Sequence, residues 1–387
     1  MDNMFDYLKW RSDLSFSKCR INEIDFALFS QLIMIPYTLY INMPMSKTDD
    51  AITLKELAVL VKENKEKFVK KMGLIVPPQI VDLVIKMGES HRFENIVLRN
   101  YESEINDSKE IQFTVCTLDI DDETRIIVYS GTDDSIIGWK EDFNMMFTFP
   151  TPAQKEAIKY LKRYSEDKKL YIVGHSKGGN LAMYSTLHIR EKIFDNIIKV
   201  YCFDAPGISE EIKDLDEAKR RFKKIIGFTP QTAIIGRLFN HLEKDIVISS
   251  TSNGLYQHDL LSWEVEVNKF KRLDSRDNDS IYIENKITKM LETMSPIVKE
   301  EFVEIGYGLF MRTKSQTLTD LANKKNQLVK QYVTIKKEER KLFEKTLSEL
   351  ILDKVFIRNI LYAIRETFGK TKEKKKYIKD NENKKRN

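Results

Sequence analysis

Residues 174–179 (GHSKGG) carry the most specific chemical signal in the chain. They contain the pattern Gly-x-Ser-x-Gly, in which a serine occupies a sharp turn between a strand and a helix. The glycines have a physical role, because only residues without a Cβ let the strand and the helix approach each other closely. A serine presented on such a turn can attack an acyl carbonyl. The pattern therefore predicts Ser176 as a nucleophile.

A serine hydroxyl is a weak nucleophile unless a neighbouring base takes its proton. His175 lies inside the pattern, and we expect it to point away from the position of a base. In this type of site the chain order is serine, acid, histidine, which favours a histidine after Ser176. His258 lies in a loop that follows a strand, whereas His241 follows a helical stretch and is predicted to lie on the surface. His258 is thus the preferred base and His241 the alternative, since His91 precedes Ser176 and His188 falls on the predicted helix after it.

The third member of such a site is a carboxylate that orients the imidazole. Asp204 ends the apolar run 197–203, the next predicted strand after the one that precedes Ser176. Catalytic carboxylates lie at the carboxyl ends of parallel strands. Asp245 is the rival, but it opens its strand and would lie at the opposite edge of the sheet. The sequence favours Asp204 and leaves Asp245 as the alternative.

Acyl transfer also needs hydrogen-bond donors where negative charge develops on the carbonyl oxygen. The backbone N–H of Lys177, directly after the nucleophile, is one candidate donor. The other should come from a loop after an earlier strand. Residues 125–130 form a β-branched run that is followed by Gly131 and Thr132. Thr132 can offer both its N–H and its hydroxyl.

Alternating strand and helix patterns surround these residues. The β-branched runs 111–118 and 125–130 predict an antiparallel hairpin. The apolar run 170–175 is typical of a strand buried on both faces. Further elements are predicted as helices over 152–165, 178–193 and 208–223, and as strands over 197–203 and 224–228. This alternation predicts an α/β-hydrolase fold with a mostly parallel central sheet.

Both ends of the chain have a helical pattern. We expect a buried helix over about 22–35, two helices within 51–87, and helices over 278–369. The uncharged stretch 26–46 is interrupted by Pro36 and Pro44, so we favour the buried helix over a membrane span. The predicted division is a hydrolase domain over 1–275 with a helical N-terminal part, a helical segment over 276–369, and a disordered basic tail over 370–387.

Charge and composition exclude several classes of protein. The tail 370–387 holds nine Lys or Arg and three acidic residues, so the rest of the chain carries a net charge of −1 out of the total of +5. The body is therefore not expected to bind nucleic acid, and the tail offers at most weak contact with an anionic membrane. The three cysteines are scattered, which argues against a disulfide framework or a zinc module. Without an apolar stretch in 1–25, we expect a cytoplasmic protein that needs no metal or cofactor.

Three blocks of the sequence resemble the class 3, fungal-type lipases: SGTDDSIIGWKEDF, GHSKGGNLA and FDAPG. Together with the opening 5–32, QHDLLSW and the helical carboxyl end, they are similar to a bacterial family of lipase-like α/β-hydrolases of unassigned function. The resemblance implies Ser176 as nucleophile, His258 as base and Thr132 in the oxyanion hole. One departure matters, because class 3 lipases place the acid after a later strand, where this chain reads TAIIG over 232–236.

Two functions follow as hypotheses. The first is a serine hydrolase of the esterase or lipase type that acts on an acyl ester or lipid through Ser176, His258 and Asp204, with the oxyanion bound by Thr132 and Lys177. The second is a catalytically vestigial hydrolase-fold module that binds a partner through its helical C-terminal segment. Pocket shape, which the sequence does not reveal, decides the acyl group.

Overall fold

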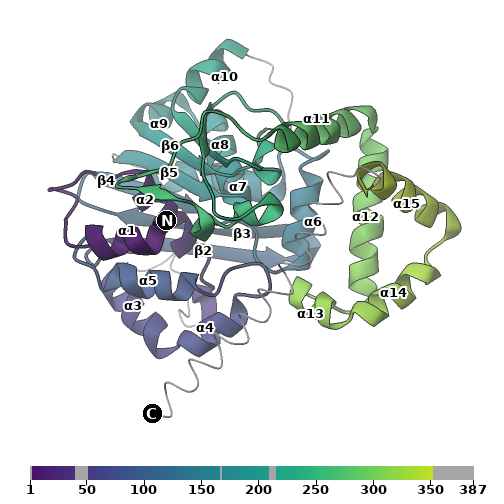
Figure 1. Ribbon diagram of the computed structural model, residues 1–387, viewed down its shortest axis with the longest axis horizontal. Coiled ribbons are helices and arrows are strands. Elements are labelled where there is room, and N and C mark those ends of the chain that lie inside the picture. Colours follow the sequence, from purple (N-terminus) through teal and green to yellow (C-terminus); the bar gives the residue numbers. More distant parts are fainter. Residues whose placement is uncertain (1, 40–50, 166–167, 209–214, 352–387) are drawn as a thin grey trace.

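The computed structural model describes residues 2–39, 51–165, 168–208 and 215–351 (Figure 1). In these residues an eight-stranded sheet has the spatial order β1-β2-β3-β4-β5-β6-β7-β8, so each strand lies beside its neighbour in the sequence. Strands β1 to β4 pair antiparallel, and β4 to β8 pair parallel. The strands are β1 (Ile52–Thr53), β2 (Val97–Asn106), β3 (Ile111–Asp119), β4 (Thr124–Tyr129), β5 (Lys169–His175), β6 (Ile197–Phe203), β7 (Ile225–Pro230) and β8 (Lys244–Ile248). The predicted α/β fold with a mostly parallel sheet is confirmed.

One face of the sheet is covered by the helices that connect its parallel strands. These are α7 (Pro152–Tyr164), α8 (Lys177–His188), α9 (Glu191–Asn196) and α10 (Leu215–Phe222). Because parallel crossovers are right-handed and every one moves to the next strand in the same direction, their helices fall on one face. Tyr160 and Leu181 pack there against sheet residues such as Ile172. This layer carries the helix that follows Ser176.

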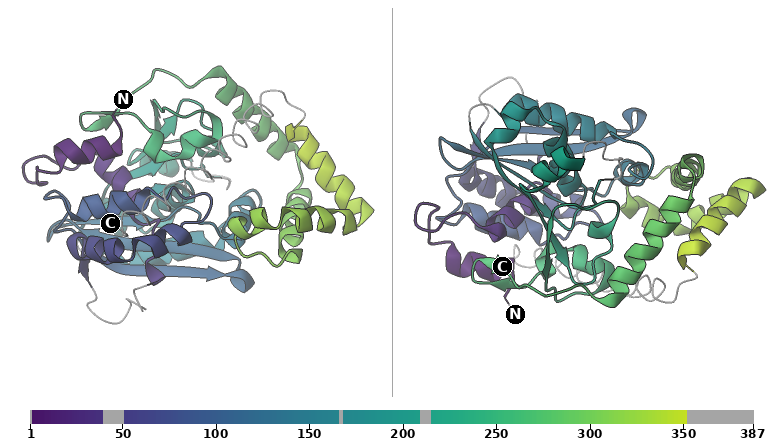
Figure 2. Two further views of the ribbon diagram at one scale, coloured as in Figure 1. Left: turned by 60° about the horizontal axis from the view of Figure 1, so that its bottom comes forward. Right: turned by 90° about the horizontal axis from the view of Figure 1, so that it is seen from above.

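The N-terminal helices cover the opposite face, which gives three layers (Figure 2). Phe26 stacks on Tyr201 of β6 with ring centroids 4.2 Å apart. The buried guanidinium of Arg92, which follows α5, pairs with Asp25 of α2 at 2.5 Å. This ion pair joins α2 to the segment that follows α5. The helices are α1 (Met4–Arg11), α2 (Glu23–Leu32), α3 (Leu54–Glu63), α4 (Lys65–Lys71) and α5 (Ile80–Gly88). Of the helices in the described ranges, none has the length and apolar character needed to cross a membrane.

The C-terminal helices stand beside the sheet rather than on either face (Figures 1 and 2). Helix α12 contacts α6 (Ile136–Asn144), the helix that follows β4. Lys140 of α6 joins the two, because its ammonium pairs with Glu304 of α12 at 2.6 Å. The helices are α11 (Asn278–Thr293), α12 (Pro296–Arg312), α13 (Leu318–Asn323), α14 (Lys325–Thr334) and α15 (Lys337–Ile351). The domain division at 275/276 stays a prediction, and 352–369 and the basic tail 370–387 lie outside the described residues.

Several elements differ from the expected pattern. Strand β2 was not predicted, and the stretch 51–87 forms three helices rather than two. The helix expected over 178–193 is divided into α8 and α9, because the backbone is extended at Ile189 and Arg190. A separate hairpin of β9 (Val265–Glu266) and β10 (Lys269–Phe270) places Phe270 and Trp263 against the sheet. None of these differences alters the strands that surround Ser176.

Candidate active site

Ser176 lies on a strained turn between β5 and α8. Its backbone has φ 57° and ψ −130°, outside the regions that residues with a Cβ ordinarily adopt. A side chain at Gly174 would collide with the backbone of Gly178, and one at Gly178 would collide with the carbonyl of Tyr129. These two glycines therefore let the strand and helix close around the turn. The Ser176 N–H donates to the Phe203 carbonyl at 3.0 Å, which fixes the turn to β6.

The proposed acid and base contact each other directly. Asp204 follows the last residue of β6, and His258 ends the 3-10 helix η4 (Gly254–His258). Nδ1 of His258 lies 2.6 Å from Oδ2 of Asp204, whose side chain is 2% exposed. A carboxylate accepts, so Nδ1 carries the hydrogen in this pair. In the neutral ring Nε2 is then free to take a proton, which is the tautomer that a general base needs.

His175 packs against the proposed base. The rings of His175 and His258 are 4.5 Å apart, and Nε2 of His175 lies 2.8 Å from the carbonyl oxygen of His258. Burial, together with the neighbouring His258, holds the pKa of His175 well below its usual range. The neutral ring therefore donates to that carbonyl through Nε2. We expected His175 to point away from the base position, and the structure shows that it supports the loop of the base instead.

The ends of neighbouring strands bring Ser176 close to this pair. His175 and Phe203 are register partners in β5 and β6, so Ser176 and Asp204 follow adjacent strand ends. His258 contacts Asp204 through Nδ1, which leaves Nε2 as the nitrogen available for the Ser176 hydroxyl. Hydrogen bonds between nucleophile and base are often long before substrate binds and shorten in the substrate complex. The arrangement has the order and adjacency of a serine–histidine–aspartate site.

The loop after β4 lies beside the nucleophile. A Cβ built on Gly131 would be 3.5 Å from the Cβ of Ser176. The hydroxyl of Thr132, the next residue, donates to Oδ2 of Asp142 at 2.6 Å. Burial raises the pKa of Asp142 to about 6, so this carboxyl takes up a proton at a higher pH than an ordinary aspartate does.

The other predicted oxyanion donor is the N–H of Lys177. Lys177 begins α8, where backbone N–H groups have no partner within the helix. Both predicted oxyanion donors therefore border Ser176.

The two rival residues have other partners. Asp245, at the start of β8, accepts from the Thr229 hydroxyl at 2.5 Å and from Arg237 at 3.2 Å. His241, predicted to lie on the surface, is buried and lies 2.6 Å from Glu243. The surface assignment was wrong, because the loop after the 3-10 helix η3 (Ile235–Arg237) folds His241 inward. Neither rival contacts the pair formed by Asp204 and His258.

A glycine missed in the sequence lies against the acid. Gly236 falls at the end of the stretch 232–236, where the resemblance to class 3 lipases led us to seek a carboxylate. A Cβ at Gly236 would collide with Oδ1 and the backbone of Asp204. The carboxyl group of Asp204 therefore occupies the space that a side chain at Gly236 would fill. This explains in steric terms why the two positions do not both carry a side chain.

Replacing Gly236 with alanine should therefore disturb Asp204. We expect slower ester hydrolysis and a loss of about 1–3 kcal/mol in the free energy of unfolding, as overpacking of a filled site costs. Urea unfolding and kcat on a soluble ester measure the two effects. Gly308→Ala on α12 is the matched control, because a Cβ there meets nothing within 4 Å. That change should stabilise the helix by about 0.5–1 kcal/mol and leave kcat unchanged. Equal behaviour of the two variants would contradict the steric role of Gly236.

Comparison with known proteins places the chain in a family. A family model described as Mbeg1-like matches residues 87–308, more than half of the chain. That family is lipase-like and related to the class 3 lipases. The matched range includes Thr132, Ser176, Asp204 and His258. No curated protein matches the chain. From the extent of the family match, this protein belongs to the Mbeg1-like family.

Proposed function

We propose that this protein is a serine hydrolase of the esterase or lipase type, which cleaves an acyl ester through an acyl-enzyme on Ser176. The observation that carries the proposal is the 2.6 Å contact between His258 Nδ1 and Asp204 at the strand end next to the Ser176 turn. The lipase-like character of the family supports the same reaction class. The proposal concerns the class of reaction and names no particular acyl group.

The reaction would proceed in two halves. The Ser176 Oγ attacks the acyl carbonyl carbon while its proton passes to Nε2 of His258, and Asp204 stabilises the resulting imidazolium. The N–H groups of Lys177 and Thr132 bind the oxyanion. The tetrahedral intermediate then expels the alcohol, which takes the proton from His258, and leaves an ester on Ser176. In the second half water adds to the ester carbonyl carbon and gives a proton to His258, which passes it to the Ser176 Oγ as the C–O bond breaks and the acid product leaves.

The proposed mechanism uses no metal or cofactor. A cytoplasmic location remains a prediction, as does weak contact of the basic tail with anionic membrane. The tail 370–387 lies outside the described residues.

Labelling of the wild-type protein tests the proposal. We expect a fluorophosphonate probe to form one adduct, mapped by mass spectrometry of peptides to Ser176, because that serine follows the strand end next to the pair formed by His258 and Asp204. A panel of p-nitrophenyl esters of different acyl lengths should then contain at least one that is hydrolysed. Heat-denatured protein is the control and should not be labelled. A folded protein with neither label nor hydrolysis would refute the assignment.

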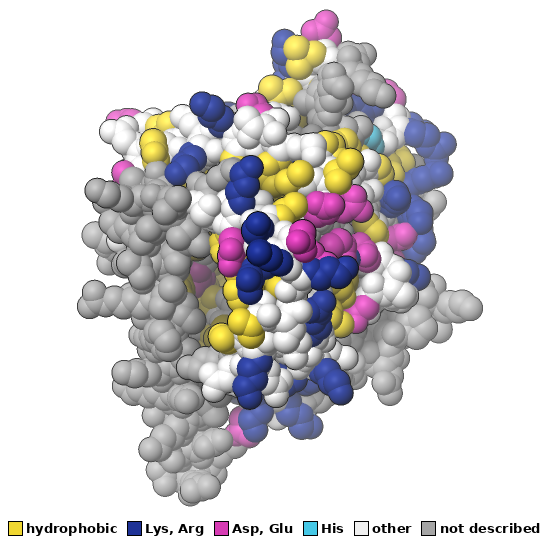
Figure 3. Space-filling view, turned by 90° about the vertical axis from the view of Figure 1, so that its right-hand side faces the viewer, with side chains coloured by type: hydrophobic (Ala, Val, Ile, Leu, Met, Phe, Trp, Pro, Cys, Tyr) yellow, Lys and Arg dark blue, Asp and Glu magenta, His cyan; other side chains and the backbone are white. Residues whose placement is uncertain are grey.

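A catalytically vestigial interaction module is the second candidate. Its support is the exposure of apolar side chains on the C-terminal helices, where Ile297, Val329 and Val333 are 67%, 66% and 63% exposed. Figure 3 shows the face of these helices, with basic side chains near its middle and acidic and hydrophobic ones around them. A module of this kind predicts a folded protein that the fluorophosphonate does not label. The same experiment therefore separates the two functions.

A further inference from the structure

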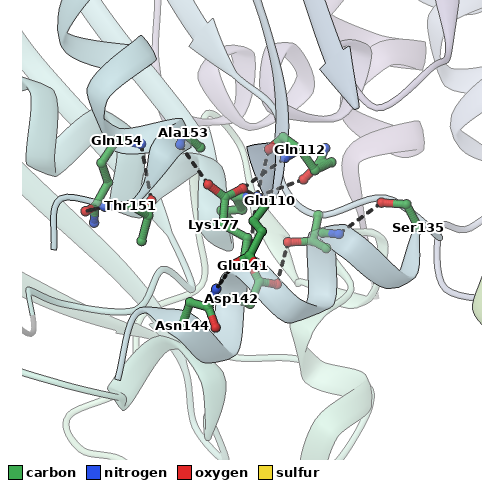
Figure 4. A network of polar contacts seen from close by, with 12 residues as sticks. Glu110, Gln112, Ser135, Glu141, Asp142, Asn144, Thr151, Ala153, Gln154 and Lys177 are labelled. Atoms are coloured by element: carbon green, nitrogen blue, oxygen red, sulfur yellow. Dashed lines mark hydrogen bonds and ion pairs between the residues drawn. The ribbon is translucent and has the colours of Figure 1, made fainter. Parts of the chain in front are cut away.

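A buried cation directly follows the nucleophile. The side chain of Lys177 is 2% exposed, and its ammonium lies 2.6 Å from Oε2 of Glu141 on α6. It also donates to the carbonyl and to the side-chain oxygen of Gln112, at 2.7 and 3.0 Å (Figure 4). Three acceptors thus satisfy the three N–H groups of a lysine. Such full pairing is what permits a charge to be buried at the first residue of α8.

Glu141 links this cation to two further elements. Its Oε2 accepts from the N–H of Gln112 at the start of β3, and its Oε1 accepts from the N–H of Ala153 at the start of α7. The Glu141 side chain is fully buried. One carboxylate therefore holds the beginnings of β3, α7 and α8 together (Figure 4). The position of the Lys177 backbone depends on this junction.

The next residue of α6 holds the other proposed oxyanion donor. Asp142 accepts the hydroxyl of Thr132 at 2.6 Å, and its Oδ1 lies 3.9 Å from the Lys177 ammonium. Consecutive carboxylates of one helix therefore contact the two residues whose N–H groups would bind the oxyanion. Helix α6 is thus a common support for both donors.

We propose that the Lys177–Glu141 ion pair is a positioning device for the oxyanion hole. Rigid placement matters, because a displacement of about 1 Å at a reacting site can cost about 10²-fold in rate. Through Glu141 the ion pair holds the Lys177 N–H at a set position relative to α6, and Asp142 does the same for Thr132. The inference rests on the proposed function. The side chains of Lys177 and Glu141 act through other groups and are positioning groups, whereas the backbone N–H of Lys177 is the group that binds the oxyanion.

A stabilising role alone would give a different result from a positioning role. Replacing both members of a buried ion pair with uncharged residues is often neutral for stability, whereas removing one member leaves a buried charge without its partner. The double variant Lys177→Met/Glu141→Gln removes both charges and keeps one oxygen at position 141, which can accept from one of the two N–H groups that Glu141 binds. If the pair served stability alone, this variant should regain both stability and rate. If it positions the oxyanion donors, stability should recover and the rate should not.

The experiment compares Lys177→Met, the double variant and Lys140→Met with wild type. Lys140 is the matched control, since it is a buried lysine of α6 paired with Glu110 and Glu304, away from Thr132 and Ser176. We measure kcat and KM on a soluble p-nitrophenyl ester, the rate of fluorophosphonate labelling, and the midpoint of thermal unfolding. For Lys177→Met and the double variant we expect kcat to fall about 10²-fold with KM little changed, as for a loss felt in the transition state. For Lys140→Met we expect a lower midpoint and an unchanged kcat.

Three outcomes would overturn the inference. A folded double variant with the kcat of wild type would show that the ion pair does not position the oxyanion donors, while leaving the serine hydrolase intact. An equal fall in kcat for Lys140→Met would show that the effect is not specific to this pair. A wild-type protein that is neither labelled nor active would refute the proposed function, and this inference with it. The double variant decides the question even if Lys177→Met fails to fold.

Discussion

Replacing Ser176 with alanine is expected to lower kcat for ester hydrolysis by about six orders of magnitude. The substitution removes the atom that forms the acyl-enzyme, so the base has no hydroxyl proton to take. What remains is the smaller acceleration from oxyanion donors and substrate binding, about 10³–10⁴ over water in a comparable site. Labelling by a fluorophosphonate should disappear completely.

The fold should survive this change. The strained backbone at Ser176, with φ 57°, is held by the surrounding glycines and by the hydrogen bond to Phe203, neither of which uses the serine hydroxyl. Circular dichroism should therefore be that of wild type. Ser185→Ala is the control, since Ser185 is a buried serine of α8, the helix that follows Ser176, and it donates to the Ala182 carbonyl at 3.2 Å. Labelling of the Ser176→Ala protein as strong as that of Ser185→Ala would contradict the nucleophile assignment.

Replacing Asp204 with asparagine is expected to reduce kcat by about 10⁴-fold, the loss found where an orienting carboxylate has been removed in isolation. Asparagine keeps the shape of the side chain but loses the charge that stabilises the imidazolium. Its amide can also donate to Nδ1 of His258, which would favour the tautomer with the hydrogen on Nε2. That tautomer cannot accept the proton of Ser176.

Asp245→Asn provides the matched comparison. Asp245 is also an aspartate of the sheet, but it lies at the start of β8 and contacts Thr229 and Arg237 rather than His258. Its replacement should therefore change kcat little, although loss of the pairing with Arg237 should lower stability. Steady-state kinetics on one soluble ester, over a range of pH, measure both variants. If kcat fell by about 10⁴-fold in Asp245→Asn and not in Asp204→Asn, Asp245 of β8 would have to be the acid.

The strands around the site were predictable because they are apolar on both faces. The runs that form β3 to β7 are rich in Val, Ile and aromatic residues, and only a buried sheet accounts for them. Strand β2 was missed because its sequence, VLRNYESEIN, mixes charged and apolar residues, as fits a strand whose second half is largely exposed. Its assignment depends on pairing with β3, a contact that no local pattern reveals.

The candidate site was predictable to a similar degree. Ser176 and its flanking glycines form a local pattern. Chain order then favoured a histidine after Ser176, and positions after predicted strands favoured His258 and Asp204, with His241 and Asp245 left as alternatives. The steric relation between Gly236 and Asp204 could not be read in this way, and neither could the burial of His241. Both depend on how loops from separate strands pack together. The same holds for Lys177 and Glu141, which lie 36 residues apart in the sequence.

The strand order of the sheet also bears on how the protein is made. Because each strand pairs with the one before it in the sequence, a strand that leaves the ribosome meets a sheet edge that already exists. Pairing between sequence neighbours shortens the search for partners and limits the time for which an edge is open to aggregation. The contact between Asp204 and His258 spans 54 residues and forms late in this sequence of events. A nascent chain that ends just before His258 has all eight strands of the sheet and Ser176, but lacks the proposed base, so the proposed hydrolysis would begin only after His258 has been translated.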